Sequence, residues 1–233
     1  MNPANLASTS ILDHASPEVA GAAAGIAAAH PAPRDYLRAA HGYLTSRMRP
    51  VYSLEERFPV SRLLREARGS CSQRMACLEG LARAHGIPTR VRALFLKGTF
   101  WAPRLPLLRL GLPERTLMPW PQFFLDGDWI GFEEVFAPLS QLAAHARHRF
   151  TNRGISMFEA VEETPVDFFG GLRRSGDPRA ADFDLTDQVA ADEGAFDSRD
   201  QLFQRFDPDG SRLGRLLFDL VYGGRTIRRD PND

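Results

Sequence analysis

Apolar side chains recur every three to four residues in several stretches of the chain, a pattern that predicts amphipathic helices. The clearest stretch begins after Gly69-Ser70, where Ser70 is suited to cap a helix that starts at Cys71. Gly86 is suited to the end of that helix, and Pro88 prevents its continuation. We expect further helices at residues 17–29, 34–48, 60–67, 138–148, 151–163, 199–206 and 213–222.

After Pro88 the pattern changes to one that is typical of strands. Apolar and polar side chains alternate along residues 89–96, as they do in a half-buried strand, and residues 99–101 are expected to extend its pairing. Residues 120–125 and 128–133 form the clearest hairpin, because the Asp126-Gly127 pair between them suits a tight turn. The intervening residues 102–117 are rich in proline and leucine, which indicates a long apolar loop of the kind that serves as a lid or binding loop.

These elements divide the chain into three parts. Residues 1–30 are an alanine-rich, partly disordered arm, whose helix either docks on the body or waits for a partner. Residues 31–173 form the core, and residues 174–233 hold a mobile acidic connection followed by C-terminal helices. The mixture of leading helices, a small sheet and trailing helices predicts an α+β fold.

Composition narrows the class of protein without naming a function. The chain has 233 residues with 29 basic and 29 acidic side chains, and no basic stripe carries interleaved aromatics, so nucleic acid is not an expected partner. No stretch has the length of a membrane span. The two cysteines, Cys71 and Cys77, fall on different faces of one helix, so we expect no disulfide and a cytoplasmic protein. Abundant arginine and alanine indicate a bacterial coding bias.

Cys71 is the candidate nucleophile because it occupies the first turn of the predicted helix. Backbone N–H groups and the positive end of the helix dipole favour a thiolate there, and such cysteines can have pKa values of about 3.5–7.5. The backbone N–H of Ser72 or Gln73 is positioned to stabilise an oxyanion. The alternative is that Cys71 is a small buried residue, as Cys77 is expected to be, and that the neighbouring polar residues only cap the helix.

The stretch from Gly69-Ser70-Cys71 to Gly86-Ile87-Pro88-Thr89-Arg90 resembles the nucleophile helix of the transglutaminase-like superfamily of papain-type folds. The resemblance covers about residues 32–135. It implies N-terminal helices, a cysteine helix packed on a small antiparallel sheet, and a His and an Asp on the following strands that complete the site.

The hairpin fixes how this chain matches the family on those strands. Matching the turn at Asp126-Gly127 puts Trp120 on the family's Trp, Glu133 on its Asp and Met118 on its His. Methionine cannot transfer a proton, and loss of a general base slows such reactions by about 10²–10⁴. Glu133 can serve as the base if burial raises its pKa from about 4.3.

The candidate site therefore has two sets of residues. The catalytic candidates are Cys71, Glu133 and Gln122, the last because it is expected to face the cysteine from the strand pair. The substrate-binding candidates are Trp120, Trp101, Ser72 and Gln73, although Trp120 equally suits packing within the sheet.

Histidines elsewhere give no clear replacement for the missing base. His85 lies at the other end of the Cys71 helix, roughly 21 Å away. His145 and His148 are spaced like a metal pair, but no third ligand lies nearby in the sequence. His14, His30 and His41 precede the core or begin it, and a substitute among them stays open. We expect no bound metal and no cofactor.

Two functions remain open. The first is a cysteine enzyme that performs acyl transfer, or amide formation or hydrolysis, on a small or carrier-bound acyl substrate in biosynthesis, since an activated acyl group demands less of a base. The second is a catalytically silent binding or scaffold protein that uses residues 102–117 as a recognition surface. A metal site built from Cys71, Glu133 and a histidine is a third, weaker possibility. Neither the substrate nor the oligomeric state follows from the sequence.

Overall fold

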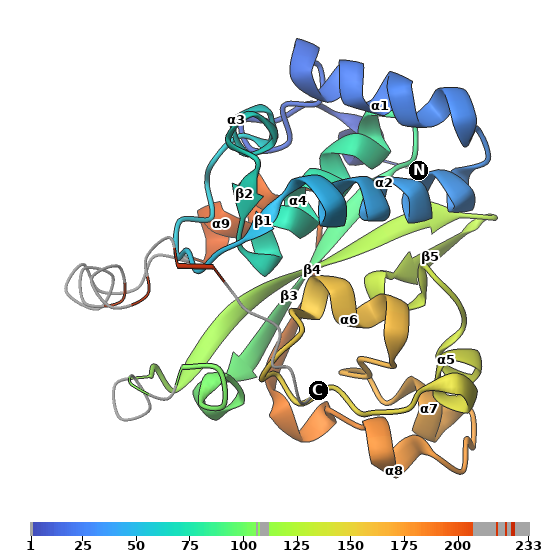
Figure 1. Cartoon of the computed structure of the whole chain (residues 1–233), viewed down its shortest axis with the longest axis vertical. Coiled ribbons are helices and arrows are strands. Elements are labelled where there is room, and N and C mark those ends of the chain that lie inside the picture. Colours follow the sequence, from blue (N-terminus) through green and yellow to red (C-terminus); the bar gives the residue numbers. More distant parts are fainter. Residues whose placement is uncertain are drawn as a thin grey trace.

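The computed structural model describes residues 2–105, 107, 112–206, 218, 222, 225 and 226. Its strands are β1 (Arg49–Pro50), β2 (Arg68–Gly69), β3 (Thr89–Lys97), β4 (Arg115–Leu125), β5 (Asp128–Gly131) and β6 (Val189–Phe196) (Figure 1). Its α-helices are α1 (Pro17–Ala29), α2 (Pro33–Arg47), α3 (Val60–Glu66), α4 (Cys71–Ala84), α5 (Leu139–His145), α6 (Met157–Glu163), α7 (Gly171–Arg174), α8 (Ala180–Phe183) and α9 (Arg199–Arg205). Short 3₁₀ turns are η1 (Pro3–Leu6), η2 (Gly98–Trp101), η4 (Phe132–Glu134) and η5 (Thr186–Gln188).

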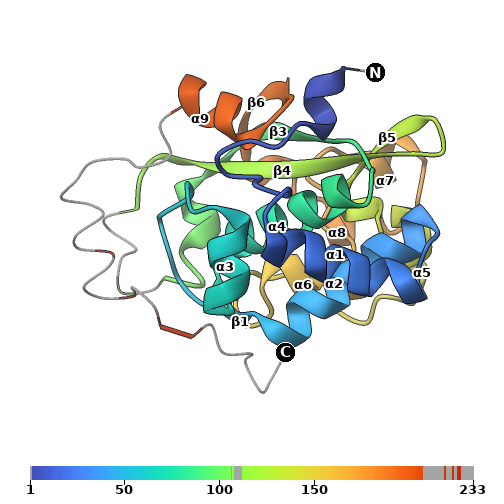
Figure 2. The same cartoon turned by 90° about the horizontal axis from the view of Figure 1, so that it is seen from above.

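The main sheet has four strands in the order β5-β4-β3-β6, and every neighbouring pair is antiparallel. Asp126 and Gly127 connect β4 to β5 with φ values of 54° and 90°, as a tight hairpin turn requires. Helices α1–α4 lie on one side of β4 and α9 on the other (Figure 2). The α+β fold and the aromatic hairpin expected from the sequence are thus confirmed.

Helix α4 is the centre of this arrangement. Every residue from Ser72 to Arg83 is buried, because α1, α2, α3, α6 and β4 all pack against it. Ser70 and Gln73 form a capping box at its start, with Ser70 Oγ accepting the Gln73 N–H at 3.2 Å and Gln73 Oε1 accepting the Ser70 N–H at 2.8 Å. The local signals that predicted this helix also fix where it begins.

Residues 2–29 are ordered, contrary to the expectation that the arm at residues 1–30 is partly disordered. Ile11 and Leu12 are buried, and α1 packs against α4 through Val19, Ala23 and Ile26. The guanidinium of Arg83 donates to the backbone carbonyls of Ala4 and Ala7 and holds this segment to α4. Of the two alternatives for the first helix, docking on the body is the one adopted.

Residues 174–197 are also more structured than a mobile connection. They contain α8, η5 and the strand β6, which pairs with β3 from Val91 to Leu96. The expectation failed because β6 has an edge position and leaves most of its side chains partly or fully exposed. Such a strand lacks the apolar alternation from which sequence reasoning works.

Smaller differences concern element boundaries. Residues 99–101 form η2 instead of extending the sheet, α6 begins at Met157 and not at residue 151, and β4 begins within the expected loop at Arg115. Elsewhere in that loop, Leu105 packs with Phe218 and Tyr222 in a small apolar cluster, while Leu107 is exposed. The helix expected at residues 213–222 lies outside the described residues, apart from Phe218 and Tyr222.

Candidate functional site

Cys71 is the first residue of α4 and is half-buried against the core. Burial raises the pKa of its thiol to about 12. Arg74, Arg104 and the backbone N–H of Phe158 act in the opposite direction, and Glu159 adds to the increase. The lowered pKa expected from the helix start is therefore wrong, because removal of the sulfur from water outweighs its favourable neighbours.

Two buried arginines flank this cysteine. Arg74 is fully buried, donates to Glu159 Oε1 at 2.6 Å and lies 4.4 Å from the ring centroid of Phe158. Arg104 donates to Asn152 Oδ1 at 2.9 Å and to the carbonyl of Ile155 at 2.6 Å. Among the described residues, Arg74 Nε and Nη2 and Arg104 Nη1 have no hydrogen-bond partner.

Sequence reasoning missed this environment, because all of its parts except Arg74 come from segments 30 to 90 residues beyond the cysteine. One local signal was available. Ser156 and Glu159 form a capping box at the start of α6, and Glu159 is the residue that pairs with Arg74. What the sequence could not supply is the folding of α6 onto α4.

Ser72 and Gln73 hold a neighbouring loop in place. Ser72 Oγ donates to Glu56 Oε2 at 2.6 Å and accepts from Arg199 at 3.0 Å. Gln73 Nε2 donates to the carbonyl of Glu55 at 2.5 Å. Both side chains are buried, and the backbone N–H of Gln73 is used by the helix cap. This geometry gives the two residues a structural role and leaves the Ser72 N–H as the oxyanion candidate.

Glu133, in η4, and Trp120, in β4, contact each other directly. Trp120 is fully buried and donates from Nε1 to Glu133 Oε2 at 2.5 Å. Burial raises the pKa of Glu133 to about 7, even though the Trp120 hydrogen bond lowers it. Burial thus gives Glu133 the raised pKa that a base at neutral pH would need. The charged groups that influence the pKa of Cys71, however, are Arg74, Glu159 and Arg104, and Glu133 is not among them.

Gly131 leaves the space that the Glu133 carboxylate occupies. A Cβ at residue 131 would lie 2.2 Å from both carboxylate oxygens, well inside any permitted contact. A side chain at this position would therefore displace the carboxylate from Trp120.

Replacing Gly131 by alanine is expected to lower the free energy of unfolding by about 1–3 kcal/mol, the usual range for overpacking in a tight site. Urea unfolding measures the loss, and the tryptophan emission should change because Trp120 loses its partner. Gly42→Ala in α2 is the matched control, since a Cβ there meets nothing within 4 Å and alanine favours a helix. Equal effects of the two substitutions would contradict the close contact.

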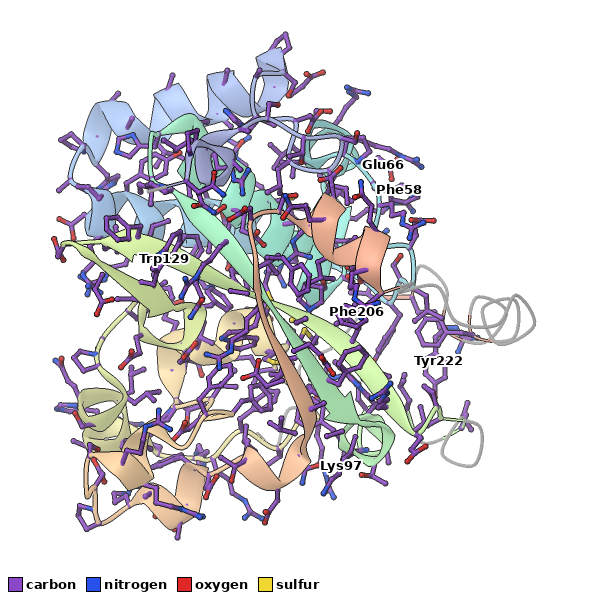
Figure 3. The ribbon with its side chains drawn as sticks, turned by 180° about the vertical axis from the view of Figure 1, so that it is seen from behind. Phe58, Glu66, Lys97, Trp129, Phe206 and Tyr222 are labelled. Carbon is purple, nitrogen blue, oxygen red and sulfur yellow. The ribbon has the colours of Figure 1, made fainter. Side chains whose placement is uncertain are left out.

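The remaining candidates make other contacts. Gln122 accepts from Arg90 Nε at 2.7 Å, and the Arg90 guanidinium lies 4.4 Å from the ring centroid of Trp129. Figure 3 shows Trp129 on the hairpin, away from Phe206 on the side of α9. Trp101 is half-buried and donates to Thr116 Oγ1 at 2.6 Å. Met118, which the sequence resemblance matches to the family's histidine, is buried opposite Leu94 on β3.

His41 is the histidine that comes nearest to this region. It shares the electrostatic influence of Arg74 and Glu159 with Cys71, and its Nε2 lies 2.6 Å from the carbonyl of Phe158. Burial lowers its pKa to about 4, so the ring is neutral at pH 7. His145 and His148 are exposed. Within the described part of the chain, no group of three or more His, Cys, Asp or Glu side chains could hold a metal ion.

A cavity of about 700 Å³ opens near η2, α8 and the loop before α6. Its lining includes Phe100, Arg149, Asn152, Arg153 and Phe183. Cys71 is not among the lining residues, but Asn152 accepts the hydrogen bond from Arg104.

Comparisons with known proteins identify the family of one segment. Residues 20–133 match the family model described as the transglutaminase-like superfamily, which is just under half of the chain. The match runs from within α1 to Glu133 and agrees with the resemblance drawn from the sequence. No curated protein and no solved structure matches the chain. None of the described helices has the length and apolar character that crossing a membrane requires.

Proposed function

We propose that this chain, whose residues 20–133 form a transglutaminase-like domain, uses that fold to bind a ligand or partner and does not turn over substrate through Cys71. One observation carries the proposal. The match at the hairpin turn puts Met118, a buried side chain without a titratable proton, at the position of the family's general base, and the Cys71 thiol has a pKa raised to about 12. At neutral pH such a thiol has neither the charge nor the base that acyl transfer needs.

The other candidate site residues, both catalytic and substrate-binding, support the same conclusion. Glu133, which takes the position of the family's Asp, has its carboxylate engaged by Trp120. Gln122 is engaged by Arg90. Ser72 and Gln73 hold residues 53–56 against α4. These side chains stabilise the fold in positions where an enzyme would need groups free to meet substrate.

A second candidate function keeps Cys71 as a nucleophile. Arg74, Arg104 and the backbone N–H of Phe158 all favour a thiolate, and the residue is only half-buried. An acyl group that arrives already activated, on a small molecule or a carrier protein or peptide, requires the least proton transfer from the enzyme. This candidate is a bacterial biosynthetic acyltransferase or amidohydrolase. Both cysteines are free, in keeping with the cytoplasm as the proposed compartment for either function.

Alkylation by iodoacetamide separates the two candidates. At pH 7.5 Cys71 in the folded protein is expected to react about 30-fold more slowly than in protein unfolded in urea. A pKa of about 12 in place of 9.0 leaves about 1,000-fold less thiolate, and the greater nucleophilicity of a more basic thiolate recovers part of that factor. Peptide mapping by mass spectrometry distinguishes Cys71 from Cys77.

Two results would favour the enzyme instead. One is a folded-state alkylation rate above the unfolded rate, with an apparent pKa below about 8.5. The other is an acyl adduct on Cys71 after incubation with a simple thioester such as S-acetyl-N-acetylcysteamine, seen by intact mass in the native chain and absent from Cys71→Ala.

A further inference from the structure

The cavity near η2 has cationic side chains at its rim that no described group neutralises. Along residues 149–154 exposed and buried side chains alternate, so that Arg149, Thr151 and Arg153 are exposed while Phe150 and Asn152 are buried. All five residues line the cavity. Neither arginine has a hydrogen bond or an ion pair with any residue in the described part of the chain.

The acidic residues of the lining are already paired. Asp184 accepts from the backbone N–H and the hydroxyl of Thr186 and from Arg173, and these partners hold its pKa low although burial raises it. Asp182 pairs with Arg179 at 3.4 Å. The cavity therefore presents two uncompensated positive charges to an incoming ligand.

Buried hydrogen bonds of Asn152 hold the loop that carries these two arginines. Asn152 adopts a φ of 54° and is almost fully buried, with its Nδ2 donating to the carbonyl of Phe100 at 2.7 Å and its Oδ1 accepting from Arg104. Arg104 is 7% exposed and carries the unpartnered Nη1. A buried network of this kind fixes the loop before a ligand arrives, which reduces the entropy lost on binding.

We propose that this cavity binds a small organic anion in which an acidic group is joined to an apolar body. Arg149 and Arg153 attract and orient the acidic group, and the hydroxyl of Thr151 is available to it as a donor. Phe100, Phe150 and Phe183 supply the apolar wall, and the volume of about 700 Å³ fits a ligand of drug-like size.

The inference deepens the proposed binding function and rests on it, because Thr99, Phe100 and Pro103 of the transglutaminase-like segment line the cavity together with residues from the C-terminal part of the chain. Asn152 of the cavity lining accepts a hydrogen bond from Arg104, whose charge acts on the Cys71 thiol. The ligand class follows from the charge and the apolar wall alone, and it does not depend on any reaction at the cysteine.

Fluorescence titration with 1-anilinonaphthalene-8-sulfonate, an apolar anion, provides the test on the full chain. We expect saturable binding, displaced by octanoate and not by octanol at the same concentration. Arg149→Gln combined with Arg153→Gln is expected to weaken the Kd at least about 10-fold, because both neutral substitutions remove charge at the rim. Arg147→Gln, at an exposed arginine of the same loop outside the cavity, is the matched control and should change the Kd less than about twofold.

The outcomes decide the proposal in either direction. Absence of saturable binding, equal displacement by octanol and octanoate, or equal Kd changes in the double variant and in Arg147→Gln would each overturn it. Thr151→Trp, a bulky substitution at an exposed rim position, is a second variant and is expected to block the probe. If the cavity does not bind the probe, the proposal that Cys71 does not turn over substrate is unaffected. If Cys71 does turn over substrate, the measured binding to the cavity is unaffected. The two proposals can therefore fail independently.

Discussion

Replacing Arg199 by alanine is expected to lower the free energy of unfolding by about 3–5 kcal/mol, the range found when one partner of a buried ion pair is removed. Arg199 is fully buried at the start of α9 and donates to Glu79 Oε1 at 2.7 Å and to Ser72 Oγ at 3.0 Å. Glu79 is fully buried too, and burial already raises its pKa despite the attraction of Arg199. Without Arg199 the buried carboxyl group would lose its hydrogen-bonded cation and keep only the weaker attraction of Arg83.

Urea unfolding of the variant and the native chain measures this loss. Gln204→Ala is the control, because residue 204 is exposed on the same helix. The double variant Glu79→Gln with Arg199→Met should recover part of the stability, since it removes both charges together. A loss below about 1 kcal/mol for Arg199→Ala would contradict the importance of the pair.

The second large effect is a dependence of stability on pH through Glu133. Its pKa is raised from 4.5 in the unfolded chain to about 7 in the fold. Between these values the folded state holds the proton and the unfolded state does not, so stability falls as the pH rises. At about 1.4 kcal/mol for each pKa unit, raising the pH from 5 to 8 is expected to lower the free energy of unfolding by up to about 3 kcal/mol.

Comparison with Glu133→Gln isolates this contribution, because glutamine does not titrate and its carbonyl oxygen still accepts from Trp120. His41 acts in the opposite sense. Its pKa is lowered to about 4, so its contribution rises with pH up to its unfolded value of 6.5. Urea unfolding at pH 5, 6, 7 and 8 measures the difference between the two chains. An identical pH dependence in both would contradict the raised pKa.

The parts of the fold that the sequence predicts are those whose signals are local. The turn at Asp126-Gly127 and the capping box of Ser70 and Gln73 each involve residues next to or three apart from one another. The edge strand β6 contains Asp192, Glu193 and Gly194, which have low strand propensity, so only its pairing with β3 makes it a strand.

The candidate site also has parts with local sequence signals and parts without them. Cys71 is proposed from its place at the helix start, and Glu133 from the family resemblance matched at the hairpin turn, together with the condition that burial must raise the Glu133 pKa. The surroundings of Cys71 are not, because the partners Arg74 and Glu159 are 85 residues apart in the sequence. The sign of the Cys71 pKa change also depends on burial, which no local pattern reveals.

Arg199 of α9 donates hydrogen bonds to Glu79 and Ser72 of α4, so the segment that matches the family depends on residues far beyond its end. The segment that matches the family ends at Glu133, and an excised fragment with those limits would lack β6, α6 and α9. Strand β3 would then present an open edge, Arg74 would lose Glu159, and Glu79 would lose its cation. We therefore expect a fragment limited to the matched segment to be less stable than the full chain, because it lacks these partners.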